Sequence, residues 1–180
     1  KIARDEEIHE SRLIELIDEE GLNYMSSVVL GLNDALVEFT GALAGYTFAL
    51  QHAKLVALTG AITGIAAALS MAASEYLSTR TENNVHKNAL KAAVYTGIAY
   101  VITVVVLILP FVLLSNVYWG LGVCLFGALV IIAIFNYYYS IVKTESFRHR
   151  FTEMAIISIG IAAISFLIGY ALRVFTGIEL

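Results

Sequence analysis

Residues 31–50 read GLNDALVEFTGALAGYTFAL, a stretch apolar enough to lie within a lipid bilayer although its first half holds Asp34 and Glu38. A helix needs about 20 predominantly apolar residues to cross the hydrocarbon core of a membrane. An ionisable side chain inside such a span is costly and commonly functional. The stretch therefore predicts a transmembrane helix with a polar site inside it.

The rest of the chain is equally apolar. Of its 180 residues 59% are hydrophobic, the mean hydropathy is +0.79, and there is one proline. Five segments are long enough to span a bilayer, at residues 27–50, 55–76, 92–114, 118–138 and 154–175. The short connections leave no room for a soluble domain after residue 21, so we expect an all-α, multi-pass membrane protein with one five-helix transmembrane domain at residues 23–180.

The basic residues predict the orientation of the spans. Nine of the eleven fall at one end of the spans: Lys1, Arg4, Arg12, Arg80, Lys87, Lys91, Lys143, Arg148 and Arg150. Lys54 and Arg173 fall at the other end. Because Lys and Arg are in excess in cytoplasmic loops, the N-terminus should be cytoplasmic and the C-terminus outside.

The first 22 residues have a different composition from the spans. Eight of the fifteen acidic residues lie within residues 1–20, in KIARDEEIHESRLIELIDEE, which predicts an amphipathic cytoplasmic helix. Glu6 and His9 share a face of that helix, the spacing by which ferritin-like bundles present di-iron ligands, although a solvated acidic helix gives the same pattern. No initiator methionine or signal peptide precedes the arm, so we expect it to continue a longer protein.

Several kinds of site are excluded by residue content. The chain has a single cysteine, Cys124, which excludes an intramolecular disulfide and a cysteine-based metal cluster. It has no glycine-rich phosphate loop, no paired nucleophile and base, and no basic, aromatic-laced surface for nucleic acid.

Small and polar residues form matching stripes on the first two spans. Residues three, four or seven apart share a helix face. The stripe of the first span is Asp34, Glu38, Gly41 and Gly45, and that of the second is Gly60, Gly64, Met71, Glu75 and Glu82. Because small residues allow helices to approach closely in lipid, we expect the two glycine pairs to pack against each other.

The acids of these stripes have two possible roles. They can be interhelical hydrogen bonders, each protonated or paired with a hydroxyl. However, Asp34, Glu38 and Glu75 lie on two facing stripes, and no basic residue lies in a span centre to neutralise them, which favours an ion or proton pathway.

The ligand types indicate which ion such a pathway would carry. Carboxylates bind divalent cations, and the thioether of Met71 favours iron, cobalt or other transition metals, although a methionine in an apolar helix is more often packing. Since a carboxylate must lose its proton to bind a metal, such a site exchanges protons for a cation.

The same residues carry a family resemblance. GLNDALVEFTGALAG (31–45) and SMAASEYLSTRTE (70–82) resemble the motifs of the vacuolar iron transporter family, and the resemblance covers the five spans from about residue 24. It implies a homodimer that exports cytosolic Fe2+, with Mn2+, Co2+ and Zn2+ as further candidate ions, in exchange for protons. Asp34, Met71 and Glu75 match the positions that line the path near the dimer interface in the family. Glu38 would add a ligand, and Glu82 would guide the ion in from the cytoplasm.

The sequence also departs from the family. Plant members carry a glutamate-rich insertion between the second and third helices, where this chain has only TRTENNVHKN (79–88). Glu38 stands where relatives have an apolar residue, and Ala35 replaces a glycine. The arm resembles the last helix of a rubrerythrin-type, ferritin-like domain, which is fused before the transporter in some prokaryotic members, so we expect a prokaryotic cell membrane.

Two other classes of function remain open at this stage. One is a membrane-anchored, ferritin-like di-iron oxidoreductase whose spans are only an anchor. The other is a signalling or assembly protein whose small-residue faces serve only dimerisation. We expect a transporter and not an enzyme, because neither rival explains acids inside the spans.

Overall fold

The computed structural model describes residues 19–81, 87–143 and 146–176. Within them every element is helical: α2 (Glu19–Asp34), η1 (Ala35–Phe39), α3 (Thr40–Leu50), α4 (Ala53–Thr81), α5 (Ala89–Leu113), α6 (Val117–Lys143) and α7 (Phe147–Thr176). The segment η1 is one stretch of π-helix that joins α2 to α3, so the three elements form one continuous first span. Glu6, His9 and Glu82 lie outside the described residues.

The prediction of five apolar spans is confirmed. In the described residues five helices are long and apolar enough to cross a membrane: Tyr24–Leu50, Ala53–Thr81, Ala89–Leu113, Val117–Ile141 and Phe147–Thr176. Most extend several residues beyond the predicted limits, because polar residues such as Thr79 and Arg80 continue a helix past its apolar core.

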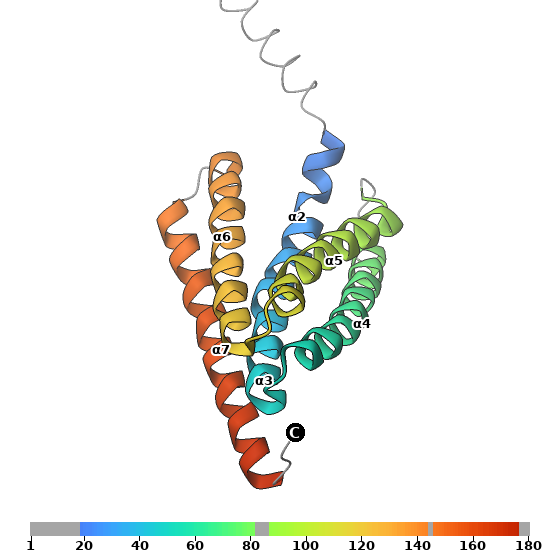
Figure 1. Ribbon diagram of the computed structural model, residues 1–180. Coiled ribbons are helices and arrows are strands. Elements are labelled where there is room, and N and C mark those ends of the chain that lie inside the picture. The colour runs from blue at the N-terminus through green and yellow to red at the C-terminus, as the bar shows by residue number, and fades with distance from the viewer. Residues whose placement is uncertain (1–18, 82–86, 144–145, 177–180) are drawn as a thin grey trace, which may run out of the picture.

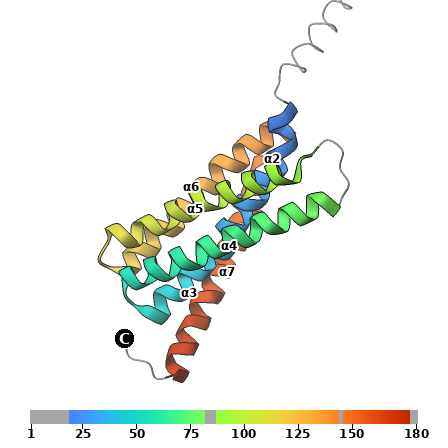
Figure 2. The same cartoon turned by 90° about the vertical axis from the view of Figure 1, so that its right-hand side faces the viewer.

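The first span lies in the middle of the bundle. Figure 1 shows α4 and α5 on one side of it and α6 and α7 on the other, and Figure 2 shows α4 and α5 side by side along their length. The most extensive pairings are α4 with α5 and α3 with α7. In the first span, 44% of the most apolar 18-residue stretch is buried inside the bundle, whereas in α7 the buried share is 17%. The helix with the acidic stripe is therefore the most enclosed of the five.

Polar residues mark where the helices begin and end. Gln51 has a left-handed backbone (φ 50°) and ends α3, so that α4 starts two residues later. The side chain of Asn88 accepts hydrogen bonds from the backbone N–H groups of Leu90 (3.0 Å) and Lys91 (3.2 Å), which caps the start of α5. These short turns between long helices give an antiparallel bundle.

Both glycine pairs lie at helix contacts, and their nearest neighbours differ. A Cβ on Gly41 would lie 2.8 Å from the side chain of Ile161 in α7, and one on Gly45 would lie 3.1 Å from the backbone oxygen of Ser165. The first pair therefore allows α3 to approach α7.

The second pair receives bulky side chains instead. A Cβ on Gly60 would meet Leu43 at 2.8 Å, and one on Gly64 would meet Val104 at 2.6 Å and Phe39 at 3.0 Å. Large side chains of the first span and of α5 thus fill the groove that the glycines of α4 leave. The π-helix contributes to this arrangement, since its extra residue turns everything after it by about 100° relative to the stripe expected from Asp34.

Candidate functional site

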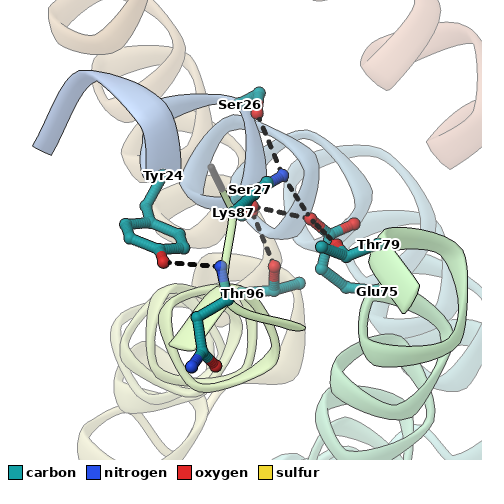
Figure 3. A network of polar contacts seen from close by, with 8 residues as sticks. Tyr24, Ser26, Ser27, Glu75, Thr79, Lys87 and Thr96 are labelled. Atoms are coloured by element: carbon teal, nitrogen blue, oxygen red, sulfur yellow. Dashed lines mark hydrogen bonds and ion pairs between the residues drawn. The ribbon is translucent and has the colours of Figure 1, made fainter. Parts of the chain in front are cut away.

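Glu75 lies on α4 with 6% of its surface exposed. Its Oε1 atom accepts a hydrogen bond of 2.6 Å from the Ser27 hydroxyl and one of 3.4 Å from the Thr79 hydroxyl. The Lys87 ammonium donates to the same oxygen at 2.9 Å and forms an ion pair with it (Figure 3). Three elements therefore supply one carboxylate with donors: α2, α4 and the residues just before α5.

The ion pair corrects the expectation that no basic residue neutralises the intramembrane acids. Lys87 is not in a span centre, but its four-carbon side chain reaches Glu75 near the end of α4, and 14% of that side chain is exposed. Its Nζ also lies 3.4 Å from the Ser26 hydroxyl. Glu75 is therefore a paired carboxylate in this structure.

Contacts between α2 and the start of α5 hold this cluster in place. The Tyr24 hydroxyl accepts a hydrogen bond of 2.9 Å from the backbone N–H of Asn88, and the Tyr24 ring stacks on Tyr95 at 5.2 Å. The Thr96 hydroxyl donates to the Ser27 backbone oxygen at 2.9 Å (Figure 3). Because Ser27 and Lys87 sit on these two anchored segments, their donors are positioned by backbone contacts and not only by their own side chains.

Asp34 and Glu38 form a second polar cluster, at the π-helix. Asp34 is half-buried and Glu38 is exposed, and the two acids lie four residues apart, close enough for their charges to interact. The first span therefore holds two neighbouring carboxyl groups at the π-helix.

Tyr100 of α5 faces this acidic pair. Its side chain is fully buried, it is coupled electrostatically to both Asp34 and Glu38, and its hydroxyl has no hydrogen-bond partner among the described residues. The Oγ1 atom of Thr40, at the end of the π-helix, is equally buried and unpartnered. Buried polar atoms without partners are rare, so the Tyr100 hydroxyl is an oxygen atom near the acids that is available to a ligand.

The π-helix itself is held by a contact from α7. The buried hydroxyl of Ser158 donates a hydrogen bond of 2.6 Å to the backbone oxygen of Leu36, inside η1. A π-turn interrupts the regular hydrogen-bond ladder of a helix, and a donor from a neighbour satisfies a carbonyl there. Such turns occur frequently at functional sites.

The two clusters lie at different depths. The Ser27 hydroxyl contacts Glu75, and Ser27 precedes Asp34 by seven residues, or about 10 Å along the helix at about 1.5 Å per residue. Met71, one turn before Glu75 on α4, is half-buried and packs against the apolar core. Among the described residues no three His, Cys, Asp or Glu side chains converge to hold a metal ion.

Ser27, Lys87 and Tyr100 are among the residues of these clusters that the sequence did not point to. Ser27 lies seven residues before Asp34 on the same helix face, so the stripe could have been extended to it. Lys87 and Tyr100 had no such signal, because their proximity to the acids depends on how α5 packs against α2 and α4.

Residues 25–90 match the VIT family. No curated protein matches the chain. The matched residues include the first two spans and the start of α5, which supply Asp34, Glu38, Met71, Glu75 and Lys87. Residues 25–90 are therefore similar to the VIT family, and the five apolar helices make the chain a candidate multi-pass membrane protein.

Proposed function

We propose that the protein exports a divalent transition metal, Fe2+ with Mn2+ as a second substrate, from the cytosol in exchange for protons. The observation that carries this proposal is the presence of two polar clusters, around Glu75 and around Asp34, along the first span of the segment that matches the VIT family. A membrane helix that served only as an anchor would not keep carboxylates and unpartnered oxygens in its interior.

The chemistry of the clusters supports cation exchange. Carboxylate and hydroxyl oxygens bind divalent cations, and the thioether of Met71 next to Glu75 favours transition metals over Mg2+ and Ca2+. A carboxylic acid must release its proton before it binds a metal. A cation that binds between Asp34 and Glu38 would therefore displace any proton that these carboxyl groups hold.

The positions of the clusters suggest the order of binding. Glu75 lies near the end of the bundle where Arg80, Lys87 and Lys91 also lie, which we propose is cytoplasmic. Asp34 lies about 10 Å further along the first span. We propose that the cation passes Glu82 and binds first at Glu75 and Met71, then at Asp34 and Glu38.

The proposal includes a homodimer. Among the residues that the structure describes, neither cluster provides three acidic or histidine ligands, whereas transition metals in proteins commonly take four or more ligands. Glu38 is exposed on the surface of the single chain, where a partner can reach it. We propose that a second copy supplies the missing ligands. A prokaryotic cell membrane and a ferritin-like domain before residue 23 remain part of the proposal.

Metal uptake into inside-out vesicles, with a pH gradient imposed across the membrane, tests this function. We expect Asp34→Asn and Glu75→Gln each to abolish uptake of Fe2+ and Mn2+, because an amide cannot exchange a proton for a cation. Glu153→Gln is the matched control, since Glu153 is an exposed acid of α7 outside both clusters, and it should transport normally. Unchanged uptake in both Asp34→Asn and Glu75→Gln would refute the proposal.

A further inference from the structure

We propose that the Lys87 ammonium is a tethered competitor for the divalent cation at Glu75, and that it sets the metal concentration at which this carboxylate loads. The inference rests on the proposed function, in which Glu75 is a metal ligand. It starts from the three donors that meet at one oxygen, Glu75 Oε1.

The donors differ in what they can do when a cation arrives. The hydroxyls of Ser27 and Thr79 have lone pairs as well as a proton, so each can rotate and present its oxygen to the cation. The Lys87 ammonium has three protons and no lone pair, so it cannot become a ligand. At 2.9 Å from Oε1 it would also repel a divalent cation bound there. Lys87 and the metal therefore exclude each other at Glu75, whereas Ser27 and Thr79 can remain.

Lys87 can leave without rearrangement of the fold. The backbone beside it is fixed, because the N–H of Asn88 is bonded to the Tyr24 hydroxyl and the Asn88 side chain caps α5. The lysine side chain has four rotatable bonds, and its Nζ already lies 3.4 Å from the exposed Ser26 hydroxyl. Rotation of this one side chain toward the Ser26 hydroxyl, which lies beside Lys87 in Figure 3, would remove the ammonium from Oε1.

Competition of this kind lowers the apparent affinity by the fraction of time for which the carboxylate is free. If Lys87 occupies Glu75 for about nine-tenths of the time, the apparent affinity is about tenfold weaker than the intrinsic affinity. The ammonium would then keep Glu75 empty of metal at low cytosolic concentrations. At higher metal concentrations the cation would displace the ammonium from Glu75.

The first test is the Mn2+ concentration that gives half-maximal uptake into inside-out vesicles. We expect Lys87→Gln, which keeps a hydrogen-bond donor but removes the charge, to lower this concentration about tenfold. Lys91→Gln removes the same charge four residues further along the chain, in the first turn of α5, and should change this concentration less than about twofold. Lys87→Arg, which retains a cation, should also change it less than about twofold. An unchanged or raised value for Lys87→Gln would overturn the inference. An equal fall in the half-maximal Mn2+ concentration for Lys91→Gln would also overturn the inference, because the effect would then come from surface charge in general.

A second measurement uses the wild-type protein and does not depend on how the variants fold. Amine acylation, quantified by mass spectrometry, should modify Lys87 about fivefold faster with saturating Mn2+ than without it, because the displaced side chain is accessible. The rate at Lys91 should not change. In Glu75→Gln, Lys87 should react fast with or without Mn2+. A Lys87 rate that does not respond to Mn2+ would overturn the inference while Asp34→Asn and Glu75→Gln still abolish uptake, whereas normal uptake in those two variants would overturn the proposed function itself.

Discussion

At Glu75, one carboxylate oxygen receives an ammonium and two hydroxyls, while at Tyr100 a buried hydroxyl has no partner at all among the described residues. The first arrangement satisfies a buried charge, and the second leaves a polar atom unsatisfied next to the acids Asp34 and Glu38. Both carry a cost in stability that an apolar residue would avoid. The cation binding that we propose would account for their presence.

Ser27 should stabilise the fold through its hydrogen bond to Glu75. We expect Ser27→Ala to lower the free energy of unfolding by about 1.5 to 3 kcal/mol, because the bond is buried, is 2.6 Å long and ends on a charged group. Thermal unfolding in detergent measures the change. Ser26→Ala is the matched control, since the exposed Ser26 hydroxyl contributes only a 3.4 Å contact to Lys87. Equal losses in the two variants would contradict this account of the cluster.

Tyr100 should matter for transport and not for stability. Tyr100→Phe removes a hydroxyl that has no partner, so the free energy of unfolding should change by less than about 1 kcal/mol. If the hydroxyl contacts the cation or a proton held by the acids, Mn2+ uptake should fall about tenfold, which corresponds to roughly 1.4 kcal/mol. Normal uptake with normal stability would show that the hydroxyl has no part in the path.

At the level of helices, the first span is shaped by its π-helix and by close backbone contacts on both sides. The Ser158 hydroxyl of α7 holds the π-helix, and α3 approaches α7 at Gly45. On the opposite side, Gly31 allows α2 to lie against the backbone of α5 at Thr96. The helix that carries Asp34 therefore packs closely against both α5 and α7.

A substitution at Gly31 tests the close contact between α2 and α5. A Cβ at this position would lie 2.5 Å from the backbone oxygen of Thr96, which cannot move without displacing α5. We expect Gly31→Ala to lower the free energy of unfolding by about 1 to 3 kcal/mol, measured by thermal unfolding in detergent. Gly160→Ala is the control, because nothing lies within 4 Å of a Cβ there. A loss in Gly160→Ala as large as that in Gly31→Ala would mean that the effect is not one of helix contact.

The limits of sequence analysis are visible in these elements. Hydropathy predicted the five spans, because a bilayer requires a long apolar run in each of them. The individual neighbours of Gly41 and Gly60 could not be read from the stripes, because the stripes assumed a regular helix and the π-helix inserts a residue before Gly41. The pairing of Glu75 with Lys87 depends on the packing of α4 against α5, which no local pattern encodes.

For the whole molecule, the distribution of charge predicts how the bundle sits in the membrane. Arg80, Lys87, Lys91, Arg148 and Arg150 lie at one end of the spans, and Lys54 and Arg173 lie at the other. Most of the remaining surface is apolar, with exposed residues such as Leu69, Ile102 and Phe126 that suit contact with lipid. The excess of Lys and Arg at one end therefore predicts that this end faces the cytoplasm.

Cysteine labelling tests the orientation directly. Cys124 is buried, so the wild-type chain should react little with a membrane-impermeant maleimide. We expect Lys54→Cys to be labelled in intact cells and Arg148→Cys to be labelled only in inside-out vesicles. Each variant is the control for the other, and labelling of Arg148→Cys in intact cells would reverse the proposed orientation.

The measurement that tests the central claim most directly is the simultaneous recording of metal and proton movement in proteoliposomes with a pH-sensitive dye in the lumen. With no initial pH gradient, we expect Mn2+ entry through the wild-type protein to make the lumen more alkaline, because each cation that enters is exchanged for protons that leave. Asp34→Asn should abolish both signals together. Mn2+ entry without any change in luminal pH would contradict proton exchange at the buried carboxylates.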